Sequence, residues 1–216
     1  MTRFLFQGDS ITDGNRGRGD DPNHIIGHSY PYPIATHMGF TYPERKFEFM
    51  NRGCSGNDIC DLYARWQSET LNLRPDILSI LIGINDACHR CESPEECYVD
   101  VFEETYRSLL RRCLTANPDM KFIILEPFTL DTGNLGHHKR LAEYVFQYAA
   151  VSRKIAQEFN AVFVPLQERF NAACAKAPVS YWIWDSVHPT YNGHGLIADA
   201  FLHDTKEFFD HYPYRD

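Results

Sequence analysis

The chain has 216 residues and a formal net charge of −8, a length that supports one well-cored domain over residues 1–216. Nucleic-acid binding needs clustered Lys and Arg, and no run of Lys and Arg here is longer than a pair such as the one in LLRRC, so the composition argues against a nucleic-acid partner. The seven cysteines are irregularly spaced, and the sequence shows neither a secretion signal nor an apolar run that could span a bilayer. We therefore expect reduced thiols, no membrane partner and a cytoplasmic location.

Five short apolar runs predict buried parallel strands. In chain order they are RFLFQ at 3–7, KFEFMN at 46–51, DILSILIG at 76–83, KFIILEP at 121–127 and AVFVPL at 161–166. Between them, apolar residues recur at helical spacing: Ile59, Leu62 and Trp66, then Val101, Tyr106, Leu109 and Leu110, then Leu141, Val145 and Tyr148. This alternation predicts an α/β fold, a three-layer α/β/α sandwich built on a five-stranded parallel sheet.

Two further segments complete the predicted architecture. A last helix is expected to begin near Thr190, after Pro189, and to run through GLIADAFLHDTKEFF. The Phe and Tyr residues of 201–214 favour core packing on one helical face and also permit a subunit contact, so a homo-oligomer stays open. The stretch GNRGRGDDPNHIIGHS at 14–29 is the longest irregular segment and a candidate substrate loop.

Polar clusters follow the first three predicted strands, namely GDSITDGN, NRGCSGND and GINDACH. Ligands of parallel sheets bind beyond the carboxyl ends of the strands, so we expect these clusters to meet at one edge. Within the first cluster, Asp9 and Asp13 are predicted to shape the turn by accepting hydrogen bonds from backbone N–H groups. They are not candidates for catalysis.

Ser10 stands where the first strand ends, and a serine there can be a mere helix cap. As a nucleophile it needs a base and a group that orients the base. Asp185 and His188, three residues apart in WIWDSVHPT, can supply this pair. The candidate donors to an oxyanion are the N–H groups of Ser10 and Gly56 and the side-chain amide of Asn85.

The blocks GDSITD, NRGCSGND, IGIND and DSVHP resemble the four signature blocks of the SGNH hydrolases, the superfamily of GDSL-type esterases and lipases. The resemblance covers nearly the whole chain, in the order and at the spacing of that family. It implies a flavodoxin-like fold, Ser10 as nucleophile and Asp185 and His188 as the rest of a triad. It also implies that Gly56 and Asn85 are oxyanion donors and that neither a metal nor a cofactor is needed.

Within the superfamily, SITDGNR, NRGCSGNDICDLYARW, LIGINDACH and WDSVHPTYNGH are most similar to cytoplasmic acetyl-xylooligosaccharide esterases and related carbohydrate deacetylases. The similarity implies hydrolysis of short-chain acyl esters, above all acetyl esters, on small carbohydrates. The sequence ACHRCESPEEC after the third block departs from that pattern, as does the loop after Asp13. Two alternatives stay open: a lysophospholipase or acyl thioesterase with the same triad, and a non-catalytic ligand-binding module.

Two residues near the last block are weaker candidates for substrate binding. Trp184 either packs in the core or walls the pocket and stacks on a sugar ring, and His194 either lines the pocket or packs. A different group has the residue types of a zinc site: Cys88, His89, Cys91 and Cys97. Its single C-x-x-C knuckle favours a reduced cysteine-rich loop over a metal site. The sequence GHHKR at 136–140 is interpreted as a solvated helix start.

Overall fold

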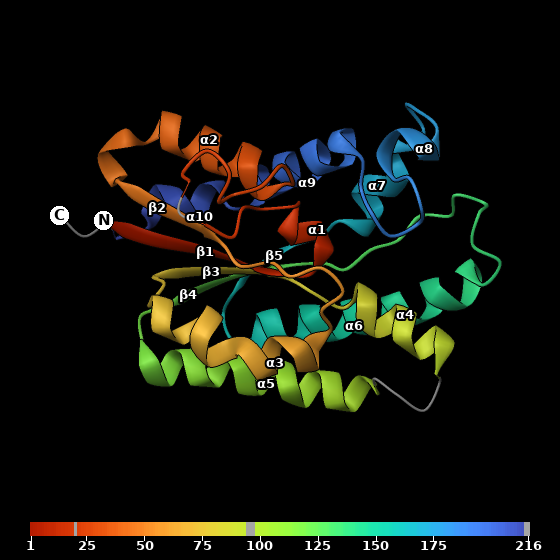
Figure 1. Ribbon diagram of the computed structural model, residues 1–216, viewed down its shortest axis with the longest axis horizontal. Coiled ribbons are helices and arrows are strands. Elements are labelled where there is room, and N and C mark those ends of the chain that lie inside the picture. The colour runs from red at the N-terminus through yellow and green to blue at the C-terminus, as the bar shows by residue number, and fades with distance from the viewer. Residues whose placement is uncertain (20, 94–97, 214–216) are drawn as a thin grey trace.

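A computed structural model describes residues 1–19, 21–93 and 98–213 (Figure 1). Its centre is a five-stranded sheet in the order β2-β1-β3-β4-β5, in which every neighbouring pair is parallel. The strands are β1 (Thr2–Gly8), β2 (Phe47–Asn51), β3 (Ile77–Leu81), β4 (Lys121–Leu125) and β5 (Val162–Val164). The five predicted strands and their parallel pairing are thus confirmed.

Burial of the strands decreases from the middle of the sheet to its edges. All of β3 is buried, whereas β2 is half-buried except at Asn51 and β5 is half-buried except at Val164. The prediction of a buried strand is therefore wrong for most of β2 and β5. Each of these edge strands has only one neighbouring strand, so part of its surface stays accessible.

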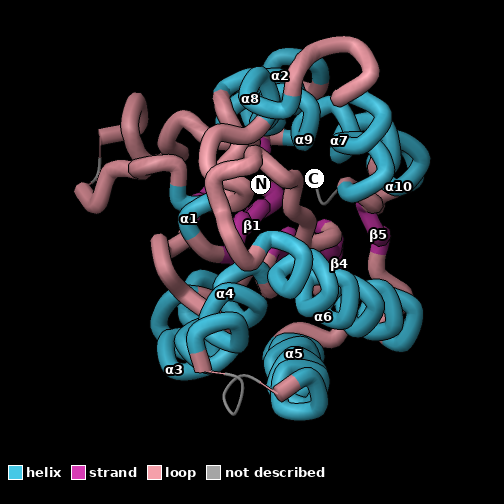
Figure 2. Tube along the Cα trace, turned by 90° about the vertical axis from the view of Figure 1, so that its right-hand side faces the viewer, coloured by secondary structure: helices cyan, strands magenta, loops and turns pink. Residues whose placement is uncertain are grey.

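Helices cover both faces of the sheet (Figures 1 and 2). One layer contains α2 (Pro31–Thr41), α7 (Gln167–Ala173), α8 (Val179–Trp182), α9 (Tyr191–Asp204) and α10 (Lys206–His211). The opposite layer contains α3 (Ile59–Glu69), α4 (Ile84–Glu92), α5 (Val99–Ala116) and α6 (His138–Glu158). The short helix α1 (Ser10–Asp13) follows β1, and the 3₁₀ turns η1 (Pro43–Arg45) and η2 (Leu71–Leu73) precede β2 and β3. The predicted three-layer α/β sandwich is confirmed.

The helical periodicity locates most of the core, with one error of phase. The predicted positions on α3 and α6 are buried, and so are those of α5 from Tyr106 onwards. Val101, however, is 42% exposed, and Phe102 is buried in its place. Phe102 packs edge-on against Tyr106 and Tyr148. The large ring of Phe102 thus determines the inward face at the start of α5.

The C-terminal segment begins as predicted but forms two helices. Thr190 caps α9 by accepting a hydrogen bond from the Gly193 N–H. The expected single helix is wrong, because α9 ends at Asp204 and α10 begins at Lys206. The rings of Phe201 and Phe209 pack against Phe4 of β1, both with centroids 6.1 Å away. These aromatic residues therefore belong to the core, while a subunit contact stays a prediction and Tyr214 lies outside the described residues.

Candidate active site

The end of β1 turns sharply into α1 and presents Ser10. Gly8 has a φ of 155°, and a Cβ there would lie 2.3 Å from the Leu81 carbonyl oxygen, so a side chain does not fit. Asp9 then caps α1, since its Oδ1 accepts a hydrogen bond of 2.9 Å from the Ile11 N–H. Ser10 is the first residue of α1 and is half-buried. Its place at the carboxyl edge of a central strand follows from this local geometry.

Asp9 and Asp13 accept hydrogen bonds from backbone N–H groups, as predicted. Asp13 is the more connected of the two, because its carboxylate accepts from the Ser55 N–H and hydroxyl and pairs with Arg18 at 2.7 Å. Asp9 is fully buried, and its Oδ2 has no hydrogen-bond partner among the described residues. Burial raises the pKa of Asp9 to about 7, although the Ile11 N–H and the charge of His188 act in the opposite direction.

Residues 183–189 form a tight loop that carries the other two candidates. An antiparallel bridge between Ile183 and Pro189 closes it. Inside the loop, Asp185 Oδ1 accepts hydrogen bonds from the N–H groups of Val187, at 3.0 Å, and of His188, at 2.7 Å. This carboxylate therefore organises the backbone of the turn as well as the imidazole.

The three predicted triad residues meet in one chain of hydrogen bonds. His188 Nδ1 lies 2.7 Å from Asp185 Oδ2, and because a carboxylate only accepts, Nδ1 carries the proton. The other ring nitrogen, Nε2, therefore accepts from the Ser10 hydroxyl at 2.8 Å, across 178 positions of sequence. This arrangement lets the imidazole take the hydroxyl proton, which is the requirement for a serine nucleophile.

The two remaining oxyanion candidates lie on neighbouring segments. Gly56 follows β2 with a φ of 83°, is exposed, and would have open space around a Cβ. Asn85 lies in the first turn of α4, beyond the end of β3, and is half-buried. Its Nδ2 donates to the carbonyl of Asn57, the residue after Gly56, at 2.9 Å. The second amide hydrogen is available to another acceptor, and the donor roles of both residues stay predictions.

The sequence analysis assigned no role to Arg65 of α3, which the structure places beside the candidate site. Its guanidinium donates to the carbonyls of Gly8, at 3.1 Å, and Arg52, at 2.8 Å. It also donates to the side-chain oxygens of Asn57 and Gln7. One side chain thus ties the end of β1 to the loop after β2. The only sequence signal is the Arg-Trp pair that closes the block NRGCSGNDICDLYARW.

Trp184 and His194, the two weaker candidates, have different surroundings. Trp184 is 62% exposed, so the core interpretation is wrong, and its ring stacks on His188 with centroids 5.9 Å apart. His194 is half-buried, and its Nδ1 accepts a hydrogen bond from the Tyr30 N–H at 3.3 Å. Burial, together with the charges of His28 and His188, lowers the pKa of His194 to about 4. His194 is therefore neutral at pH 7, and for both residues a contact with substrate stays a prediction.

The irregular segment 14–29 lines a hollow of about 380 Å³ together with α2. The lining residues are Asn15, Asn23, His24, Gly27, His28 and Tyr32. The Tyr32 ring is half exposed, and Tyr30, two residues before it, donates its N–H to His194 Nδ1 at 3.3 Å. The hollow is therefore next to the segment that contacts His194.

The cysteine-rich segment lies on α4. In the ranges that the structure describes, no group of three or more metal-ligating side chains is placed to hold an ion, and Cys97 lies outside those ranges. Burial raises the pKa of Cys88 to about 12 and also raises that of Cys91. His89 instead pairs with Asp58 at 3.3 Å. At the start of α6, His138 is half-buried, so the helix start is confirmed and the solvated state is wrong for this side chain.

Among the residues that the structure describes, no helix is both long enough and apolar enough to span a membrane.

The chain matches the sequence profile of the GDSL-like lipase/acylhydrolase family over residues 6–196. It is 36% identical over 209 residues to an acetylxylan esterase from Geobacillus stearothermophilus, covering 94% of this chain and 93% of that one.

Solved structures show the same similarity. A protein from Parabacteroides merdae described as a GDSL-like lipase superposes with a TM-score of 0.90 at 34% identity, covering 95% of each chain. The acetylxylan esterase Axe2 from Geobacillus stearothermophilus superposes with a TM-score of 0.85 at 31% identity, covering 100% of this chain and 96% of that one. The resemblance of the four blocks is thus confirmed: the chain belongs to the GDSL-like lipase/acylhydrolase family and is a GDSL-type carboxylic ester hydrolase.

Proposed function

We propose that this protein is a serine esterase that removes acetyl groups from short, soluble carbohydrates. The observation that carries the proposal is the unbroken line from Asp185 through His188 to Ser10, with hydrogen bonds of 2.7 and 2.8 Å. The similarity to an acetylxylan esterase supports the acyl group and the sugar. Catalytic mutants of Axe2 that replace a serine or an aspartate with alanine agree in residue type with the roles proposed for Ser10 and Asp185.

Acylation of Ser10 is the first half of the proposed reaction. Ser10 Oγ forms a bond to the acetyl carbonyl carbon while His188 Nε2 takes the hydroxyl proton. The carbonyl electron pair moves onto oxygen, where the Ser10 and Gly56 N–H groups and the Asn85 amide donate hydrogen bonds. The bond to the sugar oxygen then breaks, and that oxygen takes the proton from His188. The products of this half are a free sugar hydroxyl and acetyl-Ser10.

Deacylation repeats the sequence with water as the nucleophile. His188 takes a proton from water as the water oxygen bonds to the acetyl carbon, and the same donors hold the second oxyanion. The bond to Ser10 Oγ breaks and Oγ recovers its proton from His188, which releases acetic acid. The Asp185 carboxylate stabilises the imidazolium through Oδ2, which lies 2.7 Å from His188 Nδ1 before the proton is taken.

Two surfaces near the site favour a sugar over a long acyl chain. The exposed ring of Trp184 stands against His188 and offers an aromatic face of the kind on which sugar rings stack. The hollow beside residues 14–29 is lined by amide and imidazole groups and by the ring of Tyr32. A long acyl chain needs a predominantly apolar pocket, so these linings support the carbohydrate ester.

The test compares acyl chain length and substrate on the same preparations. Hydrolysis of p-nitrophenyl acetate, butyrate and octanoate is measured beside acetate release from acetylated xylooligosaccharides. The preparations are the wild type, Ser10→Ala and Ser152→Ala. Ser152 is a buried serine of α6 whose hydroxyl donates to Tyr148, so its variant is a matched control. We expect a strong preference for acetate and acetate release from the sugar, both lost in Ser10→Ala alone.

Each other outcome points to a different function. Rates that rise from acetate to octanoate would keep the triad and make the protein a lysophospholipase or acyl thioesterase. Full activity of Ser10→Ala would contradict the serine mechanism. No hydrolysis by the wild type would favour the ligand-binding module.

A further inference from the structure

The loop that carries Asp185 and His188 contains a residue in an unfavourable backbone conformation. Ser186 is fully buried and has a φ of 72°, the left-handed region that serine rarely adopts. This conformation directs the Val187 and His188 N–H groups to the Asp185 carboxylate, which accepts from both. Such a conformation persists only where surrounding contacts hold it.

The contacts come from the segment between β4 and α6. Thr129 Oγ1 donates to the Ser186 carbonyl at 2.7 Å. The Ser186 hydroxyl accepts from the Thr132 N–H at 3.2 Å and shares a hydrogen bond with the Thr132 hydroxyl at 2.8 Å. The carbonyl and the hydroxyl of Ser186 are therefore both bonded to the same short segment.

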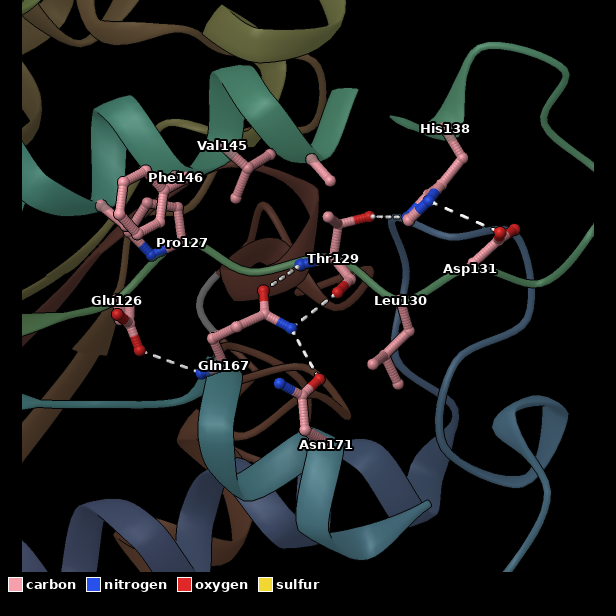
Figure 3. Close-up of a pocket in the computed structure, with 12 residues that line it drawn as sticks. Glu126, Pro127, Thr129, Leu130, Asp131, His138, Val145, Phe146, Gln167 and Asn171 are labelled. Carbon is pink, nitrogen blue, oxygen red and sulfur yellow. Dashed lines mark hydrogen bonds and ion pairs between the residues drawn. The ribbon is translucent and has the colours of Figure 1, made fainter. Parts of the chain in front are cut away.

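Thr129 is itself held on several sides (Figure 3). The Gln167 carboxamide donates to the Thr129 carbonyl at 2.9 Å and accepts from the Thr129 N–H at 3.1 Å. Since the Thr129 hydroxyl donates to Ser186, it accepts from His138 Nε2–H at 3.2 Å. Thr129 is 4% exposed. These bonds thus fix the direction in which the Thr129 hydroxyl donates to the Ser186 carbonyl.

We propose that Thr129 is a positioning residue of this esterase, whose hydroxyl bond to Ser186 holds the Asp185–His188 turn with its imidazole aimed at Ser10. The inference rests on the proposed triad. Among the described residues, Thr129 bonds to Ser186, His138 and Gln167 and not to Ser10 or His188; it acts through the backbone of Ser186. The groups that face it are Gln167 and His138.

Removing the hydroxyl leaves a buried carbonyl without its donor and lets Ser186 relax from its positive φ. The imidazole then moves relative to Ser10 Oγ, and displacement of a catalytic group by about 1 Å costs on the order of 10²-fold in rate. The proposed sugar-binding surfaces, Trp184 and the hollow at 14–32, are untouched. The loss is therefore expected in kcat and not in KM.

The experiment uses three variants of the full chain. Thr129→Val removes the hydroxyl and keeps the branched shape, and Thr129→Ser keeps the hydroxyl. Thr205→Val is the matched control, because Thr205 is also fully buried and also donates at 2.7 Å to a backbone carbonyl, that of Phe201. For each, kcat and KM on p-nitrophenyl acetate are measured across pH, together with the melting temperature.

For Thr129→Val we expect kcat to fall about 10- to 100-fold with KM unchanged. The acid limb of the kcat/KM profile should also move to lower pH, because a loosened Asp185 stabilises the imidazolium less. Thr129→Ser should restore most of kcat. Thr205→Val should lower the melting temperature to a similar degree and keep the wild-type kcat.

Wild-type kcat and pH profile in Thr129→Val would overturn the inference, and so would an equal loss of kcat in Thr205→Val. If Thr129→Val does not fold, Thr129→Ala takes its place, because it removes the same hydroxyl bond to the Ser186 carbonyl with a smaller side chain, and a wild-type kcat there overturns the inference. His188→Ala is assayed in the same series. Full activity in that variant refutes the triad itself, which separates failure of the proposed function from failure of the role of Thr129.

Discussion

Ser10 and His188 meet at 2.8 Å, yet they are held in place in different ways. Ser10 lies two residues after Gly8, the end of the interior strand β1, and the close approach of Gly8 to the neighbouring strand β3 determines where the chain turns. His188 lies in a loop outside the sheet, held by the Asp185 carboxylate and by side chains such as Thr129. The position of the proposed nucleophile therefore follows from the sheet, and that of the proposed base follows from a few side-chain hydrogen bonds.

The largest expected effect comes from removing the proposed base, His188. His188→Ala should lower kcat by at least about 10⁴-fold, because it removes the ring nitrogen that accepts the Ser10 hydroxyl at 2.8 Å. The melting temperature should change little, since His188 is half-buried in a loop. Circular dichroism melts and p-nitrophenyl acetate turnover check both parts. Asp185→Asn should lose nearly as much activity. If either variant kept a tenth of the wild-type kcat, the proposed triad would be contradicted.

The next largest effect is expected near Ser10, at the proposed oxyanion donors. Asn85→Ala should lower kcat by about 10²- to 10³-fold, the typical cost of one such donor. Asn72, an exposed asparagine of η2 that bonds Gln67, provides the control as Asn72→Ala. Steady-state kinetics on acetate esters measure the loss. Equal kcat in the two variants would remove Asn85 from the mechanism.

The third effect is expected on stability, because Arg65 joins the end of β1, close to Ser10, to the loop after β2. Arg65→Leu leaves the Arg52 carbonyl without its side-chain donor and the Gly8 carbonyl with the Cys54 N–H alone. It also removes the bonds to Asn57 and Gln7, so we expect the free energy of unfolding to fall by about 3 kcal/mol. Urea denaturation measures the loss. Arg111→Leu removes a mostly exposed arginine 3.7 Å from Glu158, and such surface pairs contribute about 0–1 kcal/mol. Similar losses in both variants would show that Arg65 does not fasten this region.

The smallest expected effect is a pH dependence at Asp9. Burial raises the pKa of this carboxyl to about 7 in the folded state, from 3.8. The folded protein therefore binds a proton that the unfolded chain has lost, and this contribution to stability fades as pH rises through 7. Between pH 6 and pH 8 the wild type should lose about 1.4 kcal/mol of unfolding free energy from this group.

Asp9→Asn keeps an oxygen for the Ile11 N–H and removes the titration. Urea denaturation at pH 6 and pH 8 should therefore show a smaller loss in Asp9→Asn than in the wild type. Because every other titrating group is shared, the difference between the two proteins isolates Asp9. An identical pH dependence in both would show that Asp9 does not titrate in this range.

The sequence was sufficient for the parts of the molecule that rest on local pattern. Alternating apolar runs and helical periodicity predicted the five parallel strands and the layers around them. The four blocks located Ser10, Asp185 and His188, and the structure brings these three side chains into one chain of hydrogen bonds. In each case a short segment carries its own signal, either a period or a turn.

The features that escaped prediction depend on contacts between distant segments. The four hydrogen bonds of Arg65 and the bond from Thr129 to Ser186 join residues far apart in sequence, and no periodicity records them. The choice of Phe102 over Val101 was decided by packing against α6. The exposure of β2 followed from its place at the sheet edge, which the order of strands along the chain does not reveal.

The stacking of Trp184 on His188 gives the site an optical reporter. Indole fluorescence responds to a neighbouring imidazole and to solvent, and this indole is 62% exposed while Trp66 is fully buried. A sugar ring that covers Trp184 would dry its surface and shift its emission to shorter wavelength. Subtracting the spectrum of Trp184→Phe isolates that signal. In the inactive variant Ser10→Ala, binding of the substrate could then be followed in real time without turnover.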